Sequence, residues 1–216
     1  MIQIVPAILD KTAQDFEKHI EQLKASTNFQ EGWIHIDFAD NKFVPNQTIS
    51  VDIVSQFPIE LKKEAHLMVV NPLNWIEDLE KAGFNRVIFH FESEDNIAEV
   101  IEAVKNAGME VGIAINPETL IDLLEPFKDK IDQVLIMGIV PGFQGKPFIP
   151  ATIDRIKDLK SKVWPVKVSI DGAVSDANAR DLADAGVDQL VIGSFLLKGD
   201  VNENVEKIWQ AISGKT

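Results

Sequence analysis

The feature that most constrains the fold is a repeated alternation of two kinds of segment. Short apolar runs rich in β-branched residues alternate with longer stretches of helical periodicity along the whole chain. This pattern is typical of a parallel sheet whose strands are connected by helices. Eight strands are predicted, at residues 3–7, 33–37, 60–68, 86–89, 110–115, 133–137, 166–170 and 189–192. Eight helices are predicted between and after them, at residues 12–25, 49–56, 72–82, 96–107, 117–124, 150–161, 175–185 and 202–212.

Eight pairs of strand and helix are the number that closes a (β/α)8 barrel, or TIM barrel. The 216 residues suffice for one such α/β barrel, and the sequence has no linker-like or low-complexity tract, so we predict a single domain over residues 1–216. Three predicted helices end in an Ala-Gly pair just before the next strand, as in Ala82-Gly83, and glycine is favoured at a left-handed helix end. The active site of a TIM barrel lies at the carboxyl ends of its strands, so polar residues there are the functional candidates.

Charge and composition exclude several classes of function. The net charge of −13 disfavours binding to nucleic acid and to anionic membranes, and we expect neither as a partner. The chain has no cysteine, which excludes disulfides, thiolate catalysis and cysteine-based zinc sites. The apolar runs have the length of strands and the first residues lack the pattern of a signal peptide, so we expect a cytoplasmic location. An anionic substrate would need a local positive site, which backbone N–H groups can build.

Polar residues stand at the carboxyl ends of three predicted strands. His35 and Asp37 are two residues apart in the second strand and therefore share one face. His66 lies near the end of the third strand, and Asp171 follows the seventh. Two imidazoles and two carboxylates at one rim predict a four-ligand site for one divalent metal ion, namely Zn, Fe, Mn or Co, among which the sequence does not choose. The alternative is a set of packed, mutually hydrogen-bonded side chains without a metal.

Glycine-containing turns follow the last three predicted strands. They are the segment Pro141, Gly142, Phe143, Gln144, Gly145 and Lys146 after the sixth strand, Gly172 and Ala173 after the seventh, and Gly193 and Ser194 after the eighth. The turns after the seventh and eighth strands are where such barrels commonly bind phosphate through backbone amides, and we predict a phosphate site there. The segment after the sixth strand is not a Walker motif, because Pro147 replaces Ser or Thr. Its length suits a plain turn or a mobile lid.

Seven segments in order resemble one known family. They are residues 6–9 (PAIL), 35–46 (HIDFADNKFVPN), 65–69 (AHLMV), 89–92 (FHFE), Met137 followed by 141–150 (PGFQGKPFIP), 170–172 (IDG) and 193–194 (GS). With these segments at the spacing of a barrel, the chain resembles the ribulose-phosphate 3-epimerase family over essentially its full length. All four candidate metal ligands stand at positions that match the family.

The resemblance implies an isomerase that inverts carbon 3 of a ketose phosphate, converting D-ribulose 5-phosphate to D-xylulose 5-phosphate in the pentose phosphate pathway. It implies a TIM barrel of the ribulose-phosphate-binding type, one divalent metal ion per chain and a homo-oligomer. Asp37 and Asp171 would transfer protons on opposite faces of the sugar through an enediolate, and both would also bind the metal together with His35 and His66. The expected substrate-binding residues are Ala7, His66, Met68, Met137, Gly142, Phe143, Gln144, Gly145, Gly172, Ala173, Gly193 and Ser194. We expect His90, near the end of the fourth strand, to support the site without binding the metal.

Several positions depart from the family pattern. Ala7 stands where the family usually has serine, and Ala39 stands where it usually has one methionine of an active-site cluster, although Met68 and Met137 remain. The usual GFGGQ is GFQGK at residues 142–146, and the usual DGG ends in Ala173. These departures concern the lining that faces the substrate more than the groups that transfer protons.

Three alternatives remain open from the sequence. The first is 3-epimerisation of a hexulose 6-phosphate such as allulose 6-phosphate, for which Ala7 and Ala39 would leave room. The second is a metal-dependent sugar-phosphate lyase or decarboxylase, a class that usually needs a lysine near the carboxylates; Lys42 is the nearest, but it is predicted to lie on a loop. The third is a sensor of sugar phosphates without catalysis, which the retention of both histidines and both aspartates disfavours.

Overall fold

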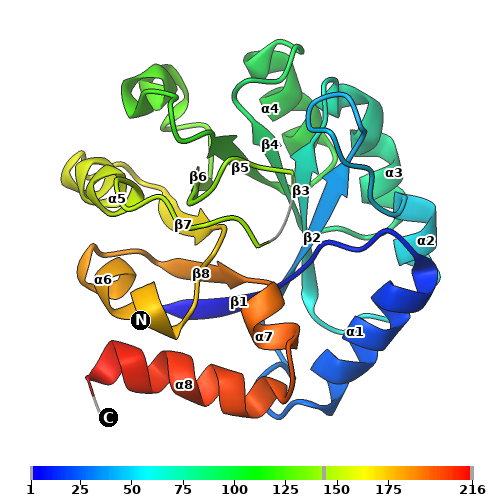
Figure 1. Ribbon diagram of the computed structural model, residues 1–216. Coiled ribbons are helices and arrows are strands. Elements are labelled where there is room, and N and C mark those ends of the chain that lie inside the picture. Colours follow the sequence, from blue (N-terminus) through cyan, green and yellow to red (C-terminus); the bar gives the residue numbers. More distant parts are fainter. Residues whose placement is uncertain (1, 143–144, 215–216) are drawn as a thin grey trace.

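The computed structural model describes residues 2–142 and 145–214, and within them eight parallel strands close into a barrel. Each strand pairs with its neighbours in chain order, and β8 pairs with β1. Helices surround the barrel, as Figure 1 shows. The predicted TIM barrel is therefore confirmed. The strands are β1 (Gln3–Ile8), β2 (Trp33–Ala39), β3 (Lys62–Met68), β4 (Arg86–His90), β5 (Glu110–Ile115), β6 (Gln133–Met137), β7 (Lys167–Asp171) and β8 (Gln189–Ile192).

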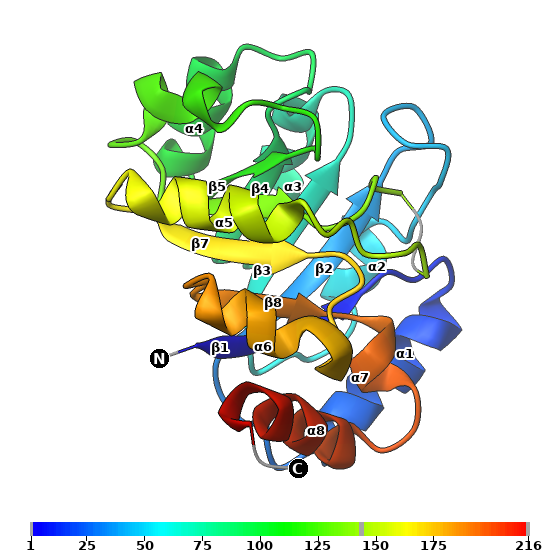
Figure 2. The same ribbon diagram turned by 60° about the vertical axis from the view of Figure 1, so that its left-hand side comes forward.

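The helices alternate with the strands, and several of them begin at the polar residues that favour a helix start. Thr12 accepts a hydrogen bond from the backbone of Asp15 at the start of α1, and Ser175 and Asn178 form a capping box at the start of α6. Figure 2 shows α5, α6 and α8 along one side of the barrel. The helices are α1 (Ala13–Ala25), α2 (Val51–Ser55), η1 (Pro72–Trp75), α3 (Ile76–Lys81), α4 (Ile97–Asn106), η2 (Ile121–Phe127), α5 (Thr152–Ser161), α6 (Asp176–Asp184), α7 (Ser194–Leu197) and α8 (Val201–Ser213).

Most predicted elements differ from the structure by one or two residues at an end, and a few differ by more or in kind. The predicted helix 117–124 overlaps only in part with the 3₁₀ helix η2 (Ile121–Phe127). This helix contains Pro126, a residue without the N–H that an α-helix needs. The predicted helix 72–82 begins as the 3₁₀ turn η1 before α3. The predicted strand 60–68 starts only at Lys62, where pairing with Trp33 of β2 begins. The short helix α7 was not predicted.

Side chains of the strands alternate between the inside of the barrel and the helices, as expected for period two. In β2, Ile34, Ile36 and Phe38 belong to the apolar core that includes residues of the surrounding helices. The inside holds a separate apolar cluster, made of Val5, Ala7, Trp33, Ile88, Ala114, Leu135, Met137 and Val191. His35 and Asp37 alternate with the outward residues of β2, so both face the barrel interior. The prediction that these two side chains share one face is therefore confirmed.

Strand register places inward side chains in rows. Asp37 of β2 is paired with His66 of β3, which is paired with Ile88 of β4 and then with Gly112 of β5. Gly112 is needed in this row, because a Cβ atom there would lie 2.8 Å from Cγ1 of Ile88. None of the helices among the described residues is both long and apolar enough to cross a membrane.

Candidate active site and metal centre

The four candidate metal ligands lie together at the carboxyl ends of their strands. His35 and Asp37 come from β2, His66 from β3 and Asp171 from β7. Each offers one nitrogen or oxygen atom, and these atoms all lie within 4.8 Å of one another. His35, Asp37 and His66 are buried, whereas Asp171 is partly exposed. Closure of the barrel thus brings together His35 and Asp171, which are 136 positions apart in the sequence.

Each histidine turns one ring nitrogen toward the aspartates. Nε2 of His35 lies 3.4 Å from Oδ1 of Asp37, and this buried nitrogen has no hydrogen-bond partner. Nδ1 of His66 lies 2.8 Å from Oδ1 of Asp37 and 3.9 Å from Oδ2 of Asp171. A buried polar atom without a partner is costly, and a bound cation would remove that cost for His35. Two imidazole nitrogens and two carboxylates therefore fit a divalent metal ion, and the cluster could hold one.

The other nitrogen of each histidine contacts a second set of side chains, which the sequence reasoning identified only in part. Nδ1 of His35 lies 2.7 Å from Oε1 of Glu64. Nε2 of His66 lies 3.0 Å from Nε2 of His90, whose Nδ1 in turn lies 3.2 Å from Glu92. His90 therefore contacts a histidine of the cluster and not its carboxylates. Each histidine of the cluster has both ring nitrogens directed at polar neighbours, which fixes the orientation of the ring.

The two aspartates have different electrostatic environments. Burial alone would raise the pKa of Asp37, but the nearby imidazole of His35 and the hydrogen bond with His66 outweigh burial and hold this pKa well below its ordinary value. Burial and the nearby charge of Asp37 raise the pKa of Asp171 to about 6. Burial lowers the pKa of His90 to about 4, so this imidazole is neutral near pH 7. In the protein without metal, Asp37 is the stronger acid of the pair.

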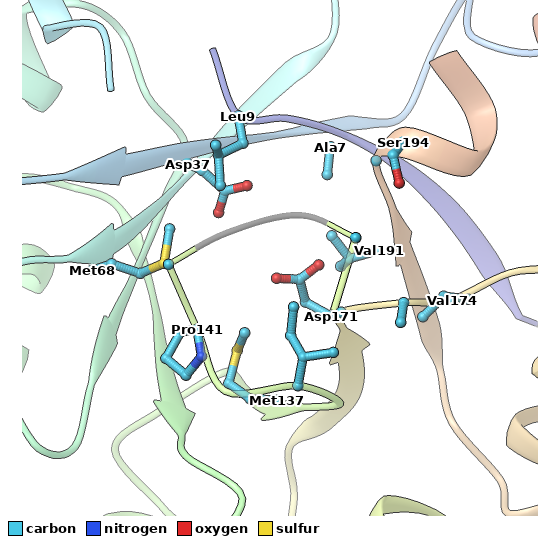
Figure 3. Close-up of a pocket in the computed structure, with 16 residues that line it drawn as sticks. Ala7, Leu9, Asp37, Met68, Met137, Pro141, Asp171, Val174, Val191 and Ser194 are labelled. Carbon is cyan, nitrogen blue, oxygen red and sulfur yellow. The ribbon is translucent and has the colours of Figure 1, made fainter. Parts of the chain in front are cut away.

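A pocket opens above the cluster. Figure 3 shows the carboxylates of Asp37 and Asp171 on different sides of this pocket, with Met68 and Met137 beside them. Among the described residues, no lysine or arginine lines it. The lining residues are Ala7, Leu9, Asp37, Met68, Met137, Ile139, Pro141, Gly142, Gly145, Asp171, Gly172, Ala173, Val174, Val191, Gly193 and Ser194.

The glycine-containing turns meet at one side of the pocket. Gly172 has φ +106°, and a Cβ atom there would lie 2.6 Å from Cγ1 of Ile139, so only glycine fits without a shift. The turn after β6 is tied to the loop after β2, because Nδ2 of Asn46 donates a hydrogen bond of 2.7 Å to the carbonyl of Gly142. The turns after β6, β7 and β8 thus border the same space.

Nine of the predicted substrate-binding residues line this pocket, and His66, among the described residues, does not. Phe143 and Gln144 lie outside the described residues. His66 is fully buried and contacts Asp37 instead of lining the pocket. Of the departures from the family pattern, Ala7 lines the pocket, whereas Ala39 is buried against Val44 and Met68. Lys42 is exposed on its loop.

Two functional candidates on β3 and just after β4 were not predicted from the sequence. Glu64 stands two residues before His66, so it shares the inward face of β3, and this spacing could have identified it. Glu92 stands two residues after His90, in the turn that follows β4. Apolar lining residues such as Leu9 and Val191 gave no signal, because each also reads as an ordinary core residue.

Comparison with known proteins places this architecture in one family. The family model described as the ribulose-phosphate 3-epimerase family matches residues 3–197. The chain belongs to the ribulose-phosphate 3-epimerase family. It is 34% identical to the ribulose-phosphate 3-epimerase of Chlamydia muridarum over 195 residues, which cover 85% of this chain and 86% of that protein. It is 31% identical to the ribulose-phosphate 3-epimerase of Schizosaccharomyces pombe, covering 94% of this chain and 90% of that protein.

More distant solved structures share only the fold with this member of the epimerase family. A 3-hexulose-6-phosphate synthase from Salmonella typhimurium superposes with a TM-score of 0.68 at 15% identity, covering 100% of both chains. A mutant tryptophan synthase alpha-subunit from Pyrococcus furiosus superposes with a TM-score of 0.71 at 16% identity, covering 98% of both chains. At such identities, the likeness establishes a TIM barrel and carries no information on the reaction.

Proposed function

We propose that this protein is an isomerase that interconverts D-ribulose 5-phosphate and D-xylulose 5-phosphate by inverting carbon 3. One observation carries the proposal: Asp37 and Asp171 flank a single pocket directly above a buried cluster that could hold a metal. Inversion of a carbon atom requires a proton-transfer group on each face of it. Membership of the ribulose-phosphate 3-epimerase family supports the same reaction.

The phosphate would bind to the turns after β7 and β8. Gly172, Ala173, Gly193 and Ser194 line this side of the pocket. Among the described residues no cationic side chain lines the pocket, so backbone N–H groups would have to supply the hydrogen bonds to the phosphate. Binding at these turns would direct the rest of the sugar toward the two aspartates.

His35, Asp37, His66 and Asp171 would hold one divalent ion, which we leave as Zn, Fe, Mn or Co. When bound, the ion would supply a Lewis acid that polarises the ketone at carbon 2 and makes the proton on carbon 3 more acidic. His35 would bind through Nε2 and His66 through Nδ1, because these nitrogens face the aspartates. The opposite nitrogens are held by Glu64 and His90, so both rings are already oriented.

Asp37 and Asp171 would move the protons. One carboxylate would remove the proton from carbon 3 and leave an enediolate, and the carboxylic acid on the other face would return a proton to the same carbon. In the reverse direction the two residues would exchange roles. Met68 and Met137 would cover the planar intermediate with polarisable apolar surface and keep water from it.

Two other functions, a lyase or decarboxylase and a sensor without catalysis, lack support at this pocket. A lyase or decarboxylase that relies on a lysine would need one at the carboxylates, and Lys42 is exposed on its loop and does not line the pocket. A sensor without catalysis would have no use for two carboxylates flanking the pocket.

We also propose a cytoplasmic location and a homo-oligomeric assembly. A rice relative at 29% identity is named the cytoplasmic isoform of the epimerase.

The test is incubation of metal-loaded protein with D-ribulose 5-phosphate in deuterated water. Proton NMR is expected to show D-xylulose 5-phosphate forming with deuterium at carbon 3 of both sugars. Binding of the sugar without exchange would contradict the proposal and favour a sensor, whereas cleavage of a carbon–carbon bond would favour a lyase. Parallel incubation with allulose 6-phosphate tests whether a hexulose phosphate is the better substrate.

A further inference from the structure

A row of four charged or titratable side chains runs beneath the metal cluster. Strand register places His35 of β2 beside Glu64 of β3, Glu64 beside Arg86 of β4, and Arg86 beside Glu110 of β5. His35, Glu64 and Arg86 are fully buried, and the side chain of Glu110 is 41% exposed. The row therefore begins at a candidate metal ligand and ends in solvent.

Contacts join the row from end to end. Oε1 of Glu64 lies 2.7 Å from Nδ1 of His35, and its Oε2 accepts a hydrogen bond of 2.7 Å from Nη1 of Arg86. Nε of Arg86 donates a hydrogen bond of 2.9 Å to Oε2 of Glu110, and its Nη2 contacts the same oxygen. The guanidinium carbon also lies 3.8 Å from the centre of the Trp33 ring, on which it stacks. Arg86 is thus held at a fixed position between two carboxylates and an aromatic ring.

The chemistry of these groups decides where the protons lie. An arginine can only donate hydrogen bonds, so Glu64 presents an acceptor to it. An ionised carboxylate can only accept, so Glu64 also presents an acceptor to His35. Nδ1 of His35 must then carry the hydrogen of that contact. A neutral imidazole with a hydrogen on Nδ1 has its free electron pair on Nε2, which is the buried nitrogen that faces Asp37 without a partner.

We infer that Glu64 and Arg86 are positioning residues that hold His35 in the tautomer whose Nε2 can bind a metal ion. Arg86 acts through Glu64, because it fixes which oxygen of Glu64 faces His35 and balances its charge inside the barrel. The inference rests on the metal site of the proposed function. It goes beyond that proposal by assigning a role to side chains that touch neither substrate nor metal.

The decisive variant is Glu64→Gln. An amide has one acceptor and one donor end, and Arg86 requires the acceptor. The NH₂ group of the introduced amide would therefore face Nδ1 of His35 and demand an acceptor there, which places the hydrogen on Nε2 and blocks metal binding. We expect zinc affinity to fall by about 10- to 100-fold, the usual effect of removing a side chain that orients a ligating histidine.

The double variant Glu64→Gln/Arg86→Met separates positioning from simple structural support. Without Arg86 the amide is free to turn its carbonyl toward His35, which restores a hydrogen on Nδ1. Zinc affinity is therefore expected to recover most of the loss, even though the double variant has lost more native contacts. A matched control is Glu110→Gln, which changes the same chemical group on the far side of Arg86; it should leave zinc affinity within about twofold, because that carboxylate is part exposed.

Zinc affinity is measured by competition with a chromophoric chelator, with thermal melting as a check on folding. A Glu64→Gln protein that binds zinc as tightly as wild type would overturn the inference, and so would a double variant that binds no better than the single one. Nitrogen NMR of zinc-loaded wild-type protein with ¹⁵N-labelled histidine tests the inference without any variant. A hydrogen on Nε2 of His35 would contradict the inference. Failure to turn over D-ribulose 5-phosphate, with the affinities as expected, would count against the proposed reaction only.

Discussion

Asp37 and Asp171 offer a test of proton transfer at the level of single residues. Asp37→Asn and Asp171→Asn each remove one acid or base, so each is expected to lower two-way epimerisation by at least about 10²- to 10⁴-fold. In deuterated water, however, each variant should still exchange the carbon 3 proton of the one epimer whose base it retains. Proton NMR of both sugars measures this directly.

Metal content must be known for these variants, because both aspartates belong to the candidate metal cluster. Elemental analysis of each variant therefore accompanies the exchange experiment. A suitable control is Asp184→Asn, which changes an exposed aspartate paired with Arg180 and should leave exchange unchanged. Full two-way epimerisation by either active-site variant would exclude the two-base scheme.

Ala7 tests which sugar the pocket accepts. It is buried, lines the pocket and is paired in register with His35. A serine hydroxyl there would add one hydrogen bond to the substrate, worth roughly 0.5 to 1.5 kcal/mol, so Ala7→Ser should raise kcat/KM on D-ribulose 5-phosphate by about tenfold or less. If the pocket instead serves a longer sugar, the added oxygen should lower kcat/KM on a hexulose 6-phosphate. Values that stay the same on both sugars would mean that residue 7 does not contact substrate.

At the scale of secondary structure elements, α7 depends on α8. Four residues are too few for a stable isolated helix, and α7 carries Ser194 at the edge of the pocket. Nδ2 of Asn204, on α8, lies within hydrogen-bond distance of three carbonyls around the end of α7, at 3.0 Å from Phe195, 3.2 Å from Leu196 and 3.0 Å from Lys198. The turn after β8 is therefore held from outside the barrel.

Asn204→Leu removes these contacts and leaves buried carbonyls unpaired. We expect a loss of about 1–3 kcal/mol in the free energy of unfolding, and a larger effect on KM than on kcat because the proposed phosphate turn loosens. Denaturant titration and steady-state kinetics measure the two effects. Asn202→Leu is the matched control, since Asn202 on the same helix accepts hydrogen bonds from Ser26 and Asn28 instead of holding α7. Equal changes of KM in both variants would contradict a specific role for Asn204.

The elements that sequence predicted correctly are those in which one pattern dominates. All eight strands were found, because parallel strands buried on both faces read as apolar runs bounded by glycine or polar turns. Helix η2 was misjudged because its apolar spacing suits an α-helix while Pro126 forbids one. Helix α7 was missed, because its stability comes from Asn204 of another element and not from its own residues.

At the scale of the whole molecule, the metal should stabilise the folded barrel. The cluster joins β2, β3 and β7, and its atoms come together only when the barrel closes. An ion that binds only the folded state at about 100 times its Kd adds about 2.7 kcal/mol of stability. For a chain of this size we expect the thermal midpoint to rise by about 5–10 °C between chelator-treated and zinc-loaded protein.

Scanning calorimetry at fixed protein concentration measures this shift. His66→Ala is the informative variant, since it removes one proposed ligand and should abolish most of the shift. His90→Ala should retain more of it, because His90 contacts His66 and not the aspartates. Equal midpoints for wild-type protein with zinc and with chelator would mean that the cluster does not bind zinc.

The candidate metal ligands could be predicted from sequence because barrel closure brings the ends of all strands to one rim, whatever the register. The row of Glu64, Arg86 and Glu110 could not be predicted in this way. Glu64 follows two lysines in β3, and Arg86 and Glu110 are the first residues of β4 and β5. The spacing within β3 relates Glu64 to His66, but only the register across the strand pairs shows that Glu64, Arg86 and Glu110 touch one another. Sequence patterns within one strand contain no information on that register.

The stacking of Arg86 on Trp33 gives the molecule a built-in optical reporter. The chain contains four tryptophans and no tyrosine, so fluorescence excited at wavelengths that phenylalanine does not absorb comes from indole rings alone. Trp33 is nearly buried and lies against the guanidinium that supports the metal centre, whereas Trp209 is 40% exposed. Emission from Trp33 should therefore resist soluble quenchers longer than emission from Trp209. A rearrangement of Arg86 beneath the metal centre can therefore be followed by the fluorescence of Trp33, without attaching a dye.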